Sequence, residues 1–228
     1  MTTHEATSNP LLQTTGYPAF DEIDASHVEP AVRQILENSS QQLEGLEGRL
    51  QDDGAPTWET TLVPLEAIGQ SWEQAWSPVS HLLGVKNSTE LREAHEAVLA
   101  DVVAFGLRVR QSQPIYEALI QLRDGPQWPD LEEPQQRIIT ERIRDAELAG
   151  IALPAHEQER YNEIAARLSQ LSTDFSNHVL DATKAWELIL DDPAAIEGMP
   201  ETLKQLASQS FNDQADSDAG QGDSDQGP

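Results

Sequence analysis

The longest uninterrupted helical period in the sequence lies between residues 154 and 184. Apolar residues recur there at steps of three, four or seven, which places their side chains on one face of an α-helix. At about 1.5 Å per residue such a helix spans roughly 45 Å, and it cannot bury an apolar stripe by itself. We therefore expect shorter helices elsewhere in the chain to pack against it. The residues of the predicted stripe are Tyr161, Ile164, Leu168, Leu171, Phe175 and Ala182.

Shorter segments with the same period precede this long helix, and turn-forming residues separate them. Ser26 and Glu29 have the S-x-x-E spacing of a capping box at the start of the first segment. Thr57 is placed to cap the second segment, which Pro78 should bend or stop because proline removes an amide donor. Gly150 is placed as a C-terminal stop before the long helix. The predicted helices of this part span residues 26–50, 57–79, 89–111, 114–125 and 131–149.

The pattern changes after the long helix. Apolar and polar residues alternate in AWELILDD, which predicts a short β-strand near 186–190, although the chain offers no second convincing strand to pair with it. A last helix is predicted from Glu201 to Gln209. Residues 211–228 are acidic and rich in Gly and Asp, a composition typical of a disordered tail or linker.

These elements predict a mostly α fold with one multi-helix domain at residues 23–210. Aromatic residues make up only 5% of the chain, and the apolar content falls on Leu, Ile, Val and Ala, which suits helix-on-helix packing. Residues 1–22 contain prolines and a glycine but no helical period, so we expect an extended N-terminal arm. The residues expected to anchor the arm are Leu11, Leu12 and Phe20.

The formal net charge is −26, from 40 acidic and 14 basic residues. Repulsion on this scale argues against nucleic acid or an anionic membrane surface as a partner. The sequence has no apolar run of membrane-spanning length and no start typical of an export signal, so we expect a cytoplasmic protein. Two interpretations of the charge stay open: an ordinary acidic protein, or adaptation to a salty cytoplasm, where screening over about 3 Å at 1 M salt removes the self-repulsion.

The residues that usually carry catalysis or bind metals show no complete motif. The absence of cysteine excludes disulfides, thiol nucleophiles and cysteine zinc sites. His95 and His156 each precede a glutamate, as in H-E-x-x-H, but the position of the second histidine holds Leu99 and Arg160 respectively. Neither G-x-S-x-G nor a glycine-rich phosphate-binding loop occurs. The sequence therefore assigns no catalytic residue and no metal ligand.

Three other groups of residues have a structural interpretation and a functional one. His95 and His178 fall on or beside apolar stripes and are interpreted as core residues, the alternative being a metal site completed elsewhere. Core packing is also favoured for the tryptophans over a peptide-binding surface. The aspartates of the tail resemble a calcium-binding loop but lack its closing glutamate and flanking helices. The tryptophans are Trp58, Trp72, Trp76 and Trp186, and the aspartates are Asp213, Asp216, Asp218, Asp223 and Asp225.

Five blocks, in the same order, carry a resemblance to a known family. They are NPLL (9–12), PAFDEIDASHVEPAV (18–32), PTWETTLVPLE (56–66), AWSPVSHLLGVKNSTELREA (75–94) and the block from GIALP to DATKAW (150–186). The sequence resembles the N-terminal half of the oligopeptidase A branch of the thimet oligopeptidase family, which are zinc metallopeptidases. The likeness extends from about residue 9 to residue 206.

This resemblance implies a neurolysin-like fold in which N-terminal helices form one wall of a deep channel that admits short peptides and excludes folded proteins. In the family, two histidines of H-E-x-x-H and a later glutamate bind one zinc ion, and the motif glutamate activates water. Those residues lie beyond the equivalent of residue 228. The resemblance therefore implies a catalytic zinc domain outside this chain, gives no catalytic or metal residue within it, leaves the substrate-binding residues unknown, and predicts that the chain alone is inactive.

The alternative is a free-standing helical module that binds peptides or proteins and derives from a split or decayed peptidase gene. The two hypotheses differ in the surface that they require. A helical part that packs against a catalytic domain should expose an apolar patch when it is alone, whereas a free-standing module should be polar there.

Overall fold

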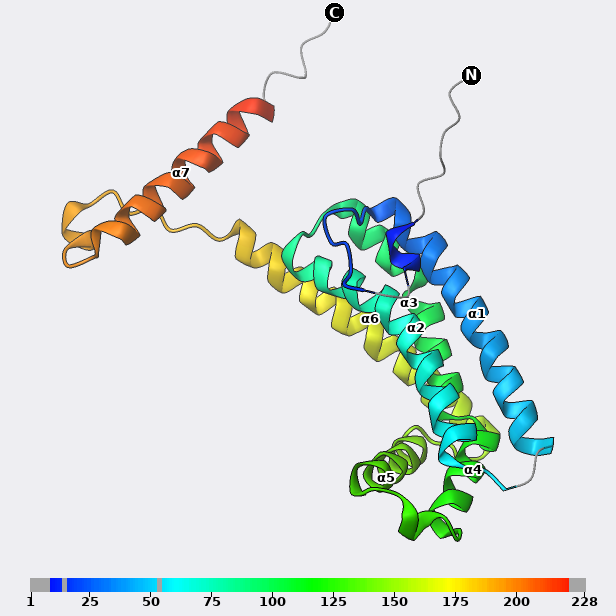
Figure 1. Cartoon of the computed structure of the whole chain (residues 1–228). Coiled ribbons are helices and arrows are strands. Elements are labelled where there is room, and N and C mark those ends of the chain that lie inside the picture. The colour runs from blue at the N-terminus through cyan, green and yellow to red at the C-terminus, as the bar shows by residue number, and fades with distance from the viewer. Residues whose placement is uncertain (1–8, 14–15, 53–54, 222–228) are drawn as a thin grey trace, which may run out of the picture. The chain divides into compact units, whose positions relative to one another are not determined.

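The computed structural model describes residues 9–13, 16–52 and 55–221, with side chains described up to residue 212 (Figure 1). Within these ranges every regular element is a helix, as the mostly α prediction requires. The α-helices are α1 (Ala25–Asp52), α2 (Trp58–Val85), α3 (Thr89–Arg110), α4 (Gln113–Asp124), α5 (Glu133–Leu148), α6 (Ala155–Ala185) and α7 (Glu201–Gln221). The short 3₁₀ helices are η1 (Pro10–Leu12), η2 (Trp128–Asp130) and η3 (Pro193–Ile196).

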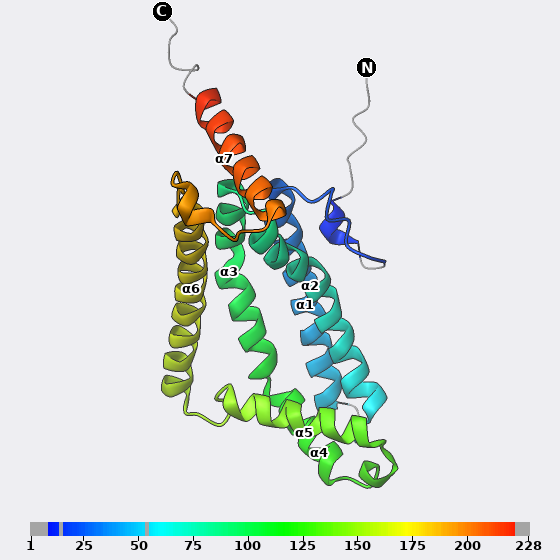
Figure 2. The ribbon, with the colours of Figure 1, turned by 90° about the vertical axis from the view of Figure 1, so that its left-hand side faces the viewer.

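The centre of the first part of the chain is α1, which packs against both α2 and α3. Figure 2 shows these three long helices side by side, with α4 and α5 packed together at the end where α1 finishes. Their facing apolar stripes form one core, because a helix gains most of its stability by burying such a stripe. Its most deeply buried large apolar side chains are Val28, Leu43, Leu46, Leu62, Val79, Val98, Leu122 and Ile139.

The predicted anchor of the N-terminal arm is confirmed at Leu11, which is buried in the core. The Asn9 side chain holds this segment in place, since its oxygen accepts from the Leu11 amide (3.0 Å) and its Nδ2 donates to the carbonyl of His27 (2.8 Å). Leu12 packs against the core, and the Phe20 ring meets the His81 ring edge-on. Residues 1–8 and 14–15 of the predicted arm lie outside the described residues.

The predicted N-terminal cap is confirmed for α2 and wrong for α1. Thr57 caps α2 as expected, in a reciprocal capping box with Thr60. The predicted capping box at Ser26 is wrong, because α1 begins at Ala25 and so places Ser26 inside the helix. The Glu29 carboxylate binds the Arg33 side chain instead (2.9 Å).

Proline does not end α2, which continues from Trp58 through Pro64 and Pro78 to Val85. The side chain of Pro78 is buried, so its packing offsets the cost of the missing amide donor. Gly150 stops α5 as predicted. Its φ of +84° is one that glycine adopts freely, and a Cβ there would lie 2.7 Å from Leu153 Cδ1.

The chain divides into two units at the junction between Phe175 and Ser176, which lies inside α6. In the second unit the predicted strand at 186–190 is wrong: residues 186–192 have no regular secondary structure. The described residues offer no strand to pair with this segment, and an unpaired strand leaves its amides and carbonyls to water.

The last helix is longer than the sequence predicts. α7 runs from Glu201 to Gln221, past the expected end at Gln209 and into the segment interpreted as a disordered tail. No proline interrupts these residues, and Asp, Ser and Gln are tolerated in a helix at modest cost. Residues 222–228 of the predicted tail lie outside the described part.

Candidate functional site

The apolar face of α6 is the main surface feature of the first unit. We define it by Ile164, Leu168, Leu171 and Phe175, whose exposed fractions are 44%, 61%, 44% and 69%. The expectation that shorter helices cover this stripe is therefore wrong, and none of the described residues of α6 is buried. The reason is that α1, α2 and α3 bury their own stripes against one another. Exposed apolar faces of this kind are typical of interaction surfaces.

A few polar contacts hold the start of α6. Gln111, at the end of α3, donates from Nε2 to Asn162 Oδ1 (2.7 Å) and to the carbonyl of Ala149 (2.8 Å). The Asn162 amide returns a hydrogen bond to Gln111 Oε1 (3.3 Å), and Gln158 donates to the carbonyl of Gly150 (3.2 Å). These bonds fix the turn into α6, and the apolar face begins beyond them at Ile164.

A groove of about 740 Å³ runs between α2, α3 and α6, which we call the α3–α6 groove. In Figure 2, the first-unit part of α6, residues 155–175, runs alongside α3. The Arg142 side chain of α5 reaches the groove and pairs there with Glu66 (2.6 Å). Charged groups therefore lie at the edge of the groove, and the residues at its base are mainly apolar. The floor residues include Leu65, Ile68, Trp72, Val102, Phe105 and Val109.

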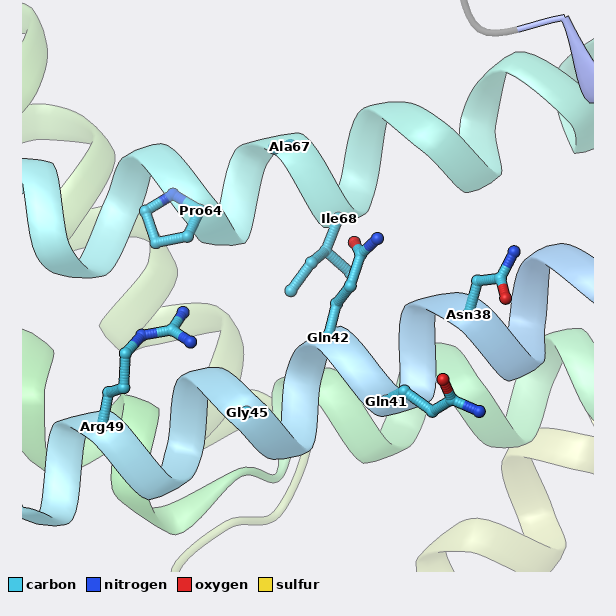
Figure 3. A pocket seen from close by; sticks show the side chains of 8 residues that line it. All are labelled: Asn38, Gln41, Gln42, Gly45, Arg49, Pro64, Ala67 and Ile68. Carbon is cyan, nitrogen blue, oxygen red and sulfur yellow. The ribbon is translucent and has the colours of Figure 1, made fainter.

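A second groove, of about 470 Å³, lies between α1 and α2, and we call it the α1–α2 groove (Figure 3). Figure 3 shows the side chains of Gln42 and Arg49 rising from α1 toward Ile68 and Pro64 of α2. No acidic residue lines it. Its lining comes from Asn38, Gln41, Gln42, Gly45 and Arg49 of α1 and from Pro64, Ala67 and Ile68 of α2.

The two histidines that the sequence singles out have different environments. His95 is buried, as predicted, and its ring stacks on the Trp76 indole at 4.6 Å between centroids. Burial lowers its pKa below the ordinary 6.5, and its Nδ1 has no hydrogen-bond partner in the described residues. The expectation of a core position is wrong for His178, which is exposed on α6. His95 belongs to the first unit of the chain and His178 to the second.

A charged cluster joins α1 to the junction of α3 and α4. The Arg108 guanidinium donates both of its terminal nitrogens to the Glu47 carboxylate, and Ser112 Oγ donates to the same carboxylate (2.5 Å). These hydrogen bonds, from Arg108 first, lower the pKa of Glu47 below the ordinary 4.5. These contacts hold α1 against the junction of α3 and α4. They also engage the Glu47 carboxylate, which is therefore not available as a catalytic base.

Core packing is confirmed for three tryptophans, since Trp58, Trp72 and Trp76 are partly buried against the core. Trp72 also lines the α3–α6 groove. Trp186 differs: it is 72% exposed in the segment that was expected to be a strand. The side chains of the tail aspartates, from Asp213 onward, lie outside those described.

A metal site would require several His, Asp or Glu side chains close together. Within the described ranges, no three His, Asp or Glu side chains come together in a way that could hold a metal ion. His95, the buried histidine, stacks on the Trp76 ring. These residues do not fit a zinc centre, so no catalytic step is assigned to them. The described helices also include none long and apolar enough to cross a membrane.

Sequence reasoning missed both grooves because each depends on which helices pair. One signal was present: Asn38, Gln41 and Gln42 have the i, i+3, i+4 spacing that places three carboxamides on one helix face. That spacing does not say which helix forms the opposite wall.

The fold is thus an all-helical domain of three long packed helices, with one further helix face uncovered. The chain belongs to the neurolysin/thimet oligopeptidase family, whose N-terminal domain model matches residues 32–159.

Three relatives extend the likeness over most of the chain. It is 42% identical over 201 residues to oligopeptidase A of Escherichia coli and 40% identical over 203 residues to oligopeptidase A of Haemophilus influenzae. It is also 42% identical over 202 residues to organellar oligopeptidase A, chloroplastic/mitochondrial, of Arabidopsis thaliana. These matches cover 88%, 89% and 89% of this chain but only 29%, 29% and 25% of the relatives. The chain therefore spans less than a third of their length.

Proposed function

We propose that this chain is the N-terminal helical part of a zinc-dependent oligopeptidase, and that a catalytic domain covers the α6 apolar face and hydrolyses short peptides. The single observation that carries the proposal is that face, where Leu168 and Phe175 stay mostly exposed although the rest of the unit has a well-packed core. The relatives, each more than three times as long as the matched part, include oligopeptidases with enough further chain to supply the covering surface.

The contribution of these residues is geometric. Three helices of 28, 28 and 22 residues pack into a layer roughly 30–40 Å long at about 1.5 Å per residue. The Glu47–Arg108 pair ties α1 to the C-terminal end of α3, and the Gln111–Asn162 pair ties that same end of α3 to the start of α6. A rigid layer of this length can serve as one wall of a channel that admits extended peptides and excludes folded proteins. Bound zinc would supply an activated water for hydrolysis, and we place its ligands outside this chain.

The rival hypothesis is a free-standing interaction module. It requires a polar surface on α6, because a module that works alone would otherwise expose apolar area to aggregation. The exposed fractions of Ile164 and Leu168 weigh against it.

We further propose a cytoplasmic location and no nucleic-acid or membrane partner. The net charge of −26 supports the second part, since it repels both kinds of surface. The relatives include a probable cytosolic oligopeptidase A and an organellar one, both of Arabidopsis thaliana.

A chimaera tests the proposed function. In it, this chain replaces the matched N-terminal part of Escherichia coli oligopeptidase A, to which it is 42% identical. We expect the chimaera to hydrolyse short peptides and the 228-residue chain with added zinc to show no hydrolysis. The remainder of the E. coli enzyme without this chain should also be inactive, because its interface would be uncovered.

The matched control is the chimaera with Leu168→Glu and Phe175→Glu. Both side chains are mostly exposed in the chain alone, so the substitutions leave its own fold intact. We expect them to reduce the activity of the chimaera. Equal activity with and without the two substitutions would overturn the role of the α6 apolar face, and chelator-sensitive hydrolysis by the chain alone would overturn the division of roles.

A further inference from the structure

The α1–α2 groove has a lining that differs from the rest of this acidic molecule. The chain holds 40 acidic residues against 14 basic ones, yet the groove has no carboxylate and has one cation, Arg49. The neighbouring Glu44 lies near Arg108 instead, where its charge helps to raise the pKa of that arginine. The residues that line the groove therefore carry one formal positive charge, although the whole molecule is strongly negative.

The polar groups of the groove are not used by the fold. Among the described residues, the side chains of Asn38, Gln41, Gln42 and Arg49 form no hydrogen bond or ion pair. The last turn of a helix favours a cation, which accounts for the position of Arg49 on α1. It does not account for three carboxamides facing the same groove. A carboxamide both donates and accepts, which matches the alternating N–H and C=O groups of a peptide backbone.

The dimensions of the groove suit a short extended peptide. From Asn38 to Arg49 α1 advances by eleven residues, or about 16 Å. At roughly 3.3 Å per residue this length accommodates about five residues of extended chain. Gly45 lies between the carboxamides and the guanidinium, at a point where a Cβ would meet Arg49 Nη1 at 3.6 Å, and Pro64, Ala67 and Ile68 give an apolar opposite wall.

We propose that the α1–α2 groove binds short peptides by their C-terminal end, with the free carboxylate on Arg49 and the preceding backbone on Gln42, Gln41 and Asn38. Arg49 presents a planar set of donors that matches a carboxylate. The carboxamides read backbone rather than side chains, so the groove selects for a free C-terminus and for length, with little preference for sequence. This site goes beyond the proposed function, since it needs neither a catalytic domain nor hydrolysis.

The test uses the 228-residue chain and a pentapeptide of Ala and Gly with a fluorescent N-terminal label, prepared with a free C-terminal carboxylate and as the C-terminal amide. Fluorescence anisotropy at about 0.15 M salt, where screening acts over about 8 Å, reduces the repulsion from the acidic surface. We expect the acid to bind up to about fivefold more tightly than the amide, the upper end of the range for an exposed ion pair.

Two matched pairs of variants locate the binding. Arg49→Gln should abolish the preference for the acid, whereas Arg137→Gln, the same charge change on an exposed residue of α5, should retain it. Gly45→Leu should weaken binding of both peptides because its side chain would occupy the groove beside the Arg49 guanidinium, whereas Gly48→Leu, also on α1 and with no atom within 4 Å of its Cβ position, should not. Both glycine substitutions favour the helix, so a loss of fold does not explain a loss of binding.

Equal affinity for acid and amide, or a preference that survives Arg49→Gln, would overturn the proposal. Binding that Gly45→Leu leaves unchanged would also overturn it, because the peptide would then lie elsewhere. None of these results bears on the chimaera, so failure of this inference is distinguishable from failure of the proposed function.

Discussion

At the scale of single residues, Glu47 shows how an acidic chain uses a carboxylate to hold helices together. Its side chain is only 13% exposed and binds the side chains of Arg108 and Ser112 from across the sequence. The two hydrogen-bond donors stabilise the charged form and so lower its pKa, although burial opposes this. The stability from this group depends on the carboxylate being ionised.

We therefore predict that Glu47→Gln lowers the free energy of unfolding by roughly 1–2 kcal/mol at pH 7. A folded-state pKa below the ordinary 4.5 gives stability that is present above that value and is lost as pH falls through the folded-state pKa. The difference between wild type and variant in urea unfolding should hence shrink below about pH 4.5.

The control for this prediction is Glu37→Gln, which removes the same charge from an exposed position on the same helix. It should change the free energy of unfolding by less than about 0.5 kcal/mol. Equal effects of the two substitutions would mean that the cluster around Glu47 contributes nothing beyond its charge.

At the scale of elements, α6 is long and amphipathic but largely unsupported by the other described helices. Leu168 is 61% exposed, whereas Leu46 of α1 is completely buried. The same residue type should thus have very different effects when it is replaced in the two helices.

We predict that Leu168→Gln changes the free energy of unfolding of the 228-residue chain by less than about 0.5 kcal/mol. Leu46→Ala should cost about 2–5 kcal/mol, because it removes buried apolar contacts and leaves a cavity. Chemical denaturation of the three proteins under the same conditions measures both values. A cost for Leu168→Gln close to that of Leu46→Ala would show that this helix face is covered in the chain alone.

The elements also show what the sequence can predict. Period and local chemistry correctly placed most helices, the cap at Thr57 and the stop at Gly150, since each depends on nearby residues. They failed for the α6 stripe and for the strand at 186–190, because a pattern says which residues share a face and not what covers or pairs with it. The same limit hid the α1–α2 groove, whose two walls come from separate helices.

At the scale of the whole molecule, the net charge of −26 must be accommodated by the fold. Like charges at this density destabilise a compact state through self-repulsion, and salt screens the repulsion. Among the described residues, the ion pairs that cross between elements include Arg33 with Asp101, whose side chains are each about half exposed. They offset little of the excess charge.

If the charge is an adaptation to a salty cytoplasm, Tm should rise by about 5 °C or more between 0.05 M and 1 M potassium chloride, equivalent to more than about 1 kcal/mol for a chain of this size. A thermal melt series followed by circular dichroism measures this. No rise in Tm over that range would leave the interpretation as an ordinary acidic protein.

The proposed function requires that a catalytic domain covers the α6 apolar face. In the chain alone, the amides of residues 164–175 lie in a helix with little tertiary support and should exchange with solvent quickly, while those of α1 stay protected.

Hydrogen–deuterium exchange, compared between the 228-residue chain and its chimaera with the remainder of Escherichia coli oligopeptidase A, tests the claim most directly. We expect exchange at residues 164–175 to slow by at least roughly tenfold in the chimaera, the effect of about 1.4 kcal/mol of added local stability. Equally fast exchange of this segment in both proteins, with α1 protected in both, would contradict it.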